Sequence, residues 1–125
     1  MESKRRETGH HHQALVDVVK IDFTALSKVS MKHVCSMMGL STVSIHISQS
    51  NCVGISGDWV VKQDVSQTGT TNSDMVEGAL VIASGVSTYG QVTKATLTME
   101  YVVIELPTTL PASGTATITI TGKAH

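Results

Sequence analysis

Residues 110–125 read LPASGTATITITGKAH, and this stretch decides the fold. Four threonines at 115, 117, 119 and 121 alternate with Ala116, Ile118 and Ile120, between Pro111 and Gly122. Alternation bounded by turn-forming residues predicts a half-buried strand with its apolar side against a core. We therefore expect the chain to finish in a packed strand.

Other segments repeat this pattern. Strand-like alternation or apolar runs occur in LVDVVKIDF (15–23), STVSIHIS (41–48), VGISGDWVVKQ (53–63) and GALVIASG (78–85), and we expect both faces of the last to be covered. The stretch 92–106 is long for one strand, and its second half is apolar on both sides. A bend, a bulge or a second contact surface near Glu100 and Tyr101 is therefore expected.

One segment has a different period. Leu26, Val29, Val34, Met37 and Met38 recur at helical spacing, and Gly39 follows as a residue suited to a left-handed helix end. The spacing predicts one short helix over 25–38. The polar stretch 64–74 predicts a surface loop that tolerates insertion near Gly69.

The whole chain reads as an all-β domain with six or seven strands. Its 125 residues suit one domain, and aromatic residues make up only 3%, so Val, Ile, Leu, Met and Ala must fill the core. Short strands separated by turns favour a sandwich or barrel. A full eight-stranded jelly roll needs a longer chain than this one, unless its loops are trimmed or its first strand is missing.

Positive charge is concentrated at the start of the chain. The formal net charge is −1, which argues against a generic nucleic-acid-binding domain, but Lys4, Arg5 and Arg6 are followed by His10, His11 and His12. We expect residues 1–13 to form a flexible basic arm in which these six residues bind RNA, unless the histidines are a remnant of a purification tag. Residues 14–125 then form the folded domain.

Signals for catalysis or cofactors are weak. His33 and Cys35 would point to different sides of the expected helix, and His46 on the polar side of its strand is read as a surface residue. Asp58, Asp64, Asp74 and Glu77 match no calcium-loop spacing, so no metal or other cofactor is expected. Cys35 and Cys52 are expected to be reduced thiols. We expect no enzyme activity, no small-molecule substrate, and neither a membrane span nor a signal peptide.

The order of these segments resembles the coat proteins of tymovirus-type plant viruses. The resemblance lies in VKIDFTALSKVSMKHVCSMMGLSTVSIHIS (19–48), VGISGDWVV (53–61), GALVIASG (78–85) and LPASGTATITITG (110–122). It covers residues 15–122, although the family's coat proteins are longer and lack a marked basic arm.

This resemblance implies a jelly-roll β-sandwich, either complete or lacking one or two strands. It also implies a capsid protein of an RNA virus, in which many copies assemble into an icosahedral shell around single-stranded RNA. The protein would then reside in the virion, and in the host cytoplasm before assembly. Charged residues make up 15% of the chain, against roughly 25% in typical soluble domains, which fits a surface buried between subunits. The alternative is a non-viral β-sandwich that binds a carbohydrate or protein ligand.

Overall fold

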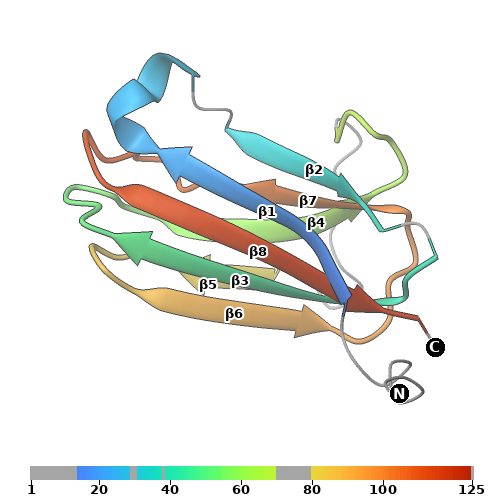
Figure 1. Cartoon of the computed structure of the whole chain (residues 1–125). Coiled ribbons are helices and arrows are strands. Elements are labelled where there is room, and N and C mark those ends of the chain that lie inside the picture. The colour runs from blue at the N-terminus through green and yellow to red at the C-terminus, as the bar shows by residue number, and fades with distance from the viewer. Residues whose placement is uncertain (1–13, 29–30, 38, 70–79, 125) are drawn as a thin grey trace, which may run out of the picture.

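The computed structural model describes residues 14–28, 31–37, 39–69 and 80–124. These residues form an all-β protein of two four-stranded antiparallel sheets that face each other (Figure 1). The strands are β1 (Ala14–Asp22), β2 (Lys32–Ser36), β3 (Thr42–Ser50), β4 (Asp58–Asp64), β5 (Leu80–Ala83), β6 (Tyr89–Lys94), β7 (Tyr101–Glu105) and β8 (Thr115–Lys123). One sheet has the order β1-β8-β3-β6 and the other β2-β7-β4-β5.

The terminal strand β8 lies in the interior of the first sheet, as the alternation predicts. It pairs with β1 on one side, where Val19 lies opposite Ile118, and with β3 on the other, where Ile45 lies opposite Ile120. Ala116, Ile118 and Ile120 are at most 1% exposed. The prediction of a packed last strand is confirmed.

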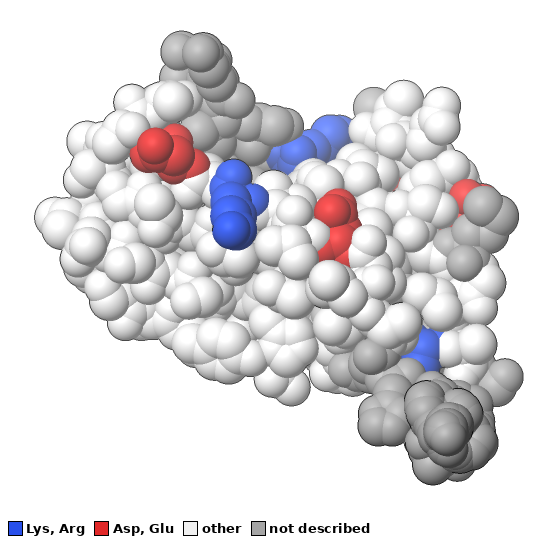
Figure 2. Space-filling view, in the orientation of Figure 1, with Lys and Arg blue, Asp and Glu red and all other residues white. Residues whose placement is uncertain are grey.

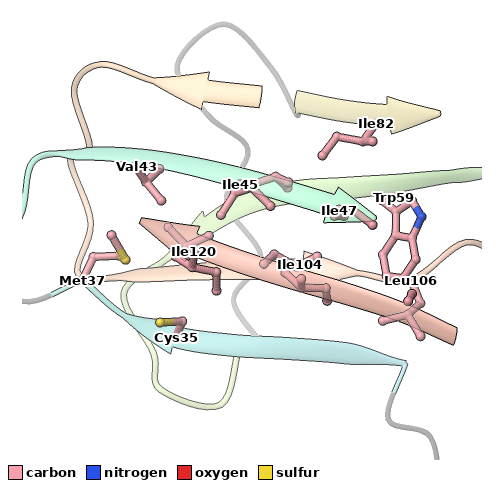
Figure 3. Packing of buried hydrophobic residues seen from close by; sticks show 14 of the residues in the cluster. Cys35, Met37, Val43, Ile45, Ile47, Trp59, Ile82, Ile104, Leu106 and Ile120 are labelled. Carbon is pink, nitrogen blue, oxygen red and sulfur yellow. The ribbon is translucent and has the colours of Figure 1, made fainter. Parts of the chain in front are cut away.

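The core between the sheets is aliphatic, with Phe23 and Trp59 as its aromatic members. Inward residues of both sheets meet there, among them Ile45 and Ile120 from the first sheet and Ile104 from the second (Figure 3). The indole Nε1 of Trp59 is buried and has no hydrogen-bond partner among the described residues.

The helix expected over 25–38 is wrong. Phe23–Lys28 form a 3-10 helix, which begins where Asp22 Oδ1 accepts hydrogen bonds from Thr24 N (3.0 Å) and Thr24 Oγ1 (2.6 Å). These bonds also lower the pKa of Asp22. Lys32–Ser36 form strand β2, because they pair with the edge of β7. The apolar residues of so short a segment fit the periodicity of a strand as well as that of a helix. Gly39 does adopt a positive φ of 82°, but in the turn from β2 to β3.

The expected number of six or seven strands was also wrong, since the described residues hold eight. The stretch 92–106 contains the end of β6 and all of β7, which lie in different sheets. A turn over 95–100 therefore explains the change of apolar side near Glu100. The expectation that both faces of β5 are covered is wrong, because Ile82 packs into the core whereas Val81 on the opposite face is 53% exposed.

The segment after β4 folds back over the second sheet. Asp64 Oδ1 accepts a hydrogen bond from Ser66 N at 2.8 Å, and Lys32 Nζ donates one to the carbonyl oxygen of Gly69 at 3.0 Å. Gly69 covers the outer side of Val103, which is fully buried. In the described part of the expected surface loop, Val65, Gln67 and Thr68 are exposed, whereas Asp64 and Gly69 are buried. Tolerance of insertions near Gly69 stays a prediction, and residues 70–74 lie outside the described residues.

Four connections gather at one end of the sandwich, opposite the end where β1 begins and β8 finishes (Figure 1). Backbone hydrogen bonds tie them together: Phe23 N to Gly114 O at 3.0 Å, Cys52 N to Val86 O at 2.8 Å, and a reciprocal pair between Ser56 and Thr109 at 3.0 and 3.1 Å. We call these connections, residues 23–28, 51–57, 84–88 and 106–114, the loop end.

Candidate interaction surface

The outer face of the β1-β8-β3-β6 sheet is rich in hydroxyl groups. Because Val43, Ile45 and Ile47 point into the core, the alternate residues of β3 lie on the outer side, and strand register aligns them with alternate residues of β8 and β6. We call this the hydroxyl face. Its Ser and Thr residues are Thr42, Ser44, Ser48, Ser50, Thr93, Thr115, Thr117, Thr119 and Thr121, of which Thr42 and Ser44 are buried.

Charge is sparse on this face. Figure 2 shows it mostly white, with isolated blue and red patches. By register, the charged residues among its described members are Lys20 and Asp22 on β1 and Lys123 at the end of β8. A ligand on the hydroxyl face would thus meet mainly neutral hydrogen-bonding groups.

A cluster of His46, Tyr89 and Gln91 lies on the same face. His46 Nδ1 is 2.5 Å from the Tyr89 hydroxyl, and that hydroxyl donates to Gln91 Oε1 at 3.4 Å. A phenol carries one hydrogen, so when it donates to Gln91 it accepts from His46 Nδ1–H. The two rings have centroids 6.0 Å apart and planes 36° apart. They form a shallow aromatic surface, in which Tyr89 is 63% exposed.

An open groove of about 330 Å³ adjoins this cluster. It lies where the edges of β5 and β6 meet, and Gly90 is essential to its shape because a Cβ there would come within 2.4 Å of Ile82 Cγ2. The lining residues are Val81, Ile82, Ala83, Ser84, Thr88, Tyr89, Gly90 and Gln91. None of these residues carries a charge, and the volume lies at the small end of the range for ligand pockets.

The structure corrects the expected placement of His33 and Cys35. Both lie on strand β2 and, being two residues apart, point to the same inner side, opposite Ile104 and Val102. His33 Nε2 contacts Asp17 Oδ2 at 2.8 Å. Burial raises the pKa of the Cys35 thiol and the Asp17 carboxylate raises it further, whereas an activated nucleophile requires a lowered pKa. Cys35 and Cys52 are both free and buried.

Acidic residues do not converge on a metal site in the part of the chain that the structure describes. Asp64 is buried and caps the segment after β4, and Asp58 lies at the start of β4. Asp74 and Glu77 lie outside the described residues. Among the described helical residues, none forms a segment long and apolar enough to cross a bilayer.

The six residues expected to bind RNA, Lys4, Arg5, Arg6, His10, His11 and His12, all lie outside the described residues. The sequence pattern predicts His46 on the polar side of its strand, and the burial of β3 confirms this. The pattern does not predict the cluster of His46 with Tyr89 and Gln91. These residues are separated from His46 by more than 40 positions, and only the pairing of β3 with β6 brings them together. A single sequence carries no signal for that pairing.

The fold and this surface define a two-sheet antiparallel β-sandwich with a hydroxyl-rich outer face that carries few charges. No family model, curated protein or solved structure matches the chain.

Proposed function

We propose that the chain is a jelly-roll capsid subunit that assembles, in many copies, into an icosahedral shell around single-stranded RNA. The observation that carries the proposal is the pairing of the strands. β1 pairs with β8, β2 with β7, β3 with β6 and β4 with β5. One antiparallel ribbon that doubles back between β4 and β5 and wraps into two sheets would produce these four pairs, which supports the jelly-roll proposal.

The surface supports repeated self-association. Large apolar side chains are exposed on several sides of the described domain: Leu15, Val18, Met31, Val53, Val65, Val81, Val86 and Tyr89. Two of them, Val53 and Val86, lie on the loop end, where backbone hydrogen bonds hold neighbouring connections together. A rigid end with exposed apolar side chains suits a contact between copies, because little ordering entropy is lost on association.

The resemblance to tymovirus-type coat proteins and the basic segment before β1 support single-stranded RNA as the packaged partner. Under this proposal the protein resides in the virion, and in the host cytoplasm before assembly. It needs no cofactor, small-molecule substrate or membrane.

The test is assembly of the full chain in the presence of single-stranded RNA, followed by sedimentation, electron microscopy and nuclease treatment. We expect closed, uniform particles that protect RNA. Ile118→Asp is the matched control, because a chain that cannot fold can form only irregular aggregates. A wild-type chain that remains monomeric with RNA contradicts the proposal and favours the alternative, a carbohydrate- or protein-binding module.

A further inference from the structure

We propose that Tyr89, His46 and Gln91, with the adjoining β5–β6 groove, form a binding site for one nucleotide of single-stranded RNA. The base stacks on the ring of Tyr89 at the groove, and the RNA backbone crosses the hydroxyl face toward β1. The site takes the packaged RNA as its ligand and in this respect rests on the proposed function.

The state of the Tyr89 ring supports stacking. The ring is largely exposed, yet its hydroxyl is held between His46 Nδ1 and Gln91 Oε1. Fixing the ring before a ligand arrives reduces the ordering entropy lost on binding. A flat nucleobase can stack on such a ring whatever its sequence, which is how sequence-tolerant proteins hold single strands.

The groove supplies space beside the ring. At about 330 Å³ it suits a small planar group, and its apolar side is formed by Val81 and Ile82. No carboxylate lies among its lining residues, so a nearby phosphate meets no repulsion from the groove itself.

The rest of the hydroxyl face suits the RNA backbone. Crossing from β6 to β1 covers three strand spacings, or about 14 Å. Along this path lie hydroxyls of β3 and β8, which can donate to phosphate oxygens, and Lys20 on β1. Asp22 is the acidic residue that strand register places on this face, and its carboxylate accepts hydrogen bonds from Thr24.

Charge favours RNA over a neutral carbohydrate, the other ligand that commonly packs on an exposed tyrosine. By strand register, Lys20 and Lys123 lie on the hydroxyl face, and they are positive groups that a phosphate backbone uses and a neutral sugar does not. In the sequence, Lys4, Arg5 and Arg6 precede β1, which is an edge strand of the same sheet.

The test measures binding of a fluorescent six-nucleotide oligouridylate to the unassembled full-length chain by anisotropy. Tyr89→Ala should weaken binding about 5- to 150-fold, the range for loss of one base–aromatic stack. Tyr89→Phe, which keeps the ring, should stay within about threefold of wild type. Lys20→Ala should weaken binding and reduce its salt dependence, whereas Lys62→Ala on the outer side of the other sheet should change neither.

A second readout locates the base directly. A hexamer containing 5-iodouridine, irradiated in the complex, should crosslink to Tyr89 rather than to Tyr101. Three results would each overturn the site. They are crosslinking to another residue, equal RNA affinity of Tyr89→Ala and wild type, and an equal loss of RNA affinity in Tyr89→Phe and Tyr89→Ala. So would Tyr89-dependent binding of a neutral hexasaccharide without binding of the RNA.

The outcomes for the site and for the proposed function are distinguishable. Particle formation is followed by sedimentation in the same preparations. A chain that forms RNA-containing particles but binds the hexamer independently of Tyr89 overturns the site alone. A chain that never assembles overturns the shell function, while the hexamer measurements still decide the site.

Discussion

His33 on β2 and Asp17 on β1 join the two sheets by a contact of 2.8 Å between Nε2 and Oδ2. β1 and β2 are edge strands of different sheets on the same side of the sandwich, and they do not pair through their backbones. The contact therefore links the two sheets along β1 and β2, where no backbone hydrogen bonds between strands connect them.

We predict a measurable coupling between these two side chains. The side chains are 27% and 39% exposed, so partial solvent screening limits the coupling to about 0.5–1 kcal/mol. A double-mutant cycle with His33→Ala and Asp17→Ala, measured by urea unfolding, gives the value. The Lys62–Glu105 pair, at 3.5 Å within one sheet, provides a comparison cycle. Additive effects at Asp17 and His33 would show that the contact does not hold the sheets together.

The Cys35 thiol should react slowly with iodoacetamide at pH 8, because burial and the Asp17 carboxylate both raise its pKa and keep the thiolate scarce. In a Cys52→Ala background, Asp17→Asn should shift the rate profile to lower pH, since it removes the carboxylate's contribution. His33→Ala breaks the same contact but keeps the Asp17 carboxylate. It therefore controls for any increase in the accessibility of Cys35 when β1 and β2 are no longer linked. If both variants accelerate the reaction of Cys35 equally, the effect comes from easier access of the reagent to the thiol and not from the charge of Asp17.

Ile120→Asp should prevent folding. Ile120 is fully buried, and an unpaired carboxylate in the core costs several kcal/mol, comparable with the stability of a domain of this size. Thr119→Asp is the matched control, because the neighbouring side chain lies on the outer face. Circular dichroism and thermal unfolding should show a folded control and an unfolded Ile120→Asp. A folded Ile120→Asp would mean that β8 is not packed as described.

Gly69→Ala should destabilise the protein by about 2–4 kcal/mol. Its φ of +67° disfavours an L side chain, and an added Cβ would lie 2.8 Å from Val34 Cγ2. Gly39→Ala shares the backbone penalty, with φ +82°, but meets nothing within 4 Å, so about 1–2 kcal/mol is expected. Chemical denaturation of both variants separates packing from backbone strain. Equal losses would show that Gly69 is not packed against the second sheet.

Deletion of residues 1–12 should weaken RNA binding and reduce its salt dependence. Lys4, Arg5 and Arg6 supply three charges at pH 7.5, and protonation of His10, His11 and His12 near pH 5.5 roughly doubles that number. At about 0.7 per contact in log K against log salt, the slope should change by about 2 at pH 7.5 and about 4 at pH 5.5. Binding at both pH values and two salt concentrations checks this. Equal, pH-independent binding by the two forms would end this role for the arm.

Periodicity predicted the strands where one side meets the core and the other meets solvent. β8 alternates for this reason. β3 was also predicted from its residues, although its burial alternates only from Ile45 onward. The pattern failed where a residue is covered from both sides. Val102, Val103 and Ile104 are all fully buried, because the chain after β4 lies over Val103, so the apolar residues of β7 do not alternate.

The helix prediction failed for a related reason. The spacing of apolar residues over 25–38 fits a helix, but the free edge of β7 takes up Lys32–Ser36 as a strand. Local preference is weak for so short a run, and sheet pairing overrides it. The cluster of His46 with Tyr89 and Gln91 depends on the same kind of long-range pairing, and was equally hidden from the sequence.

The position of β8 between β1 and β3 sets the timing of folding during protein synthesis. β8 is the last of the eight strands to be translated, and β1 pairs with β8 alone. During synthesis β1 therefore has no strand to pair with until β8 has been made. A nascent chain that ends before residue 115 cannot build the first sheet, and its apolar strands stay available to chaperones or to neighbouring nascent chains. Because these pairings span nearly the whole chain, we expect slow folding that begins only after β8 has left the ribosome.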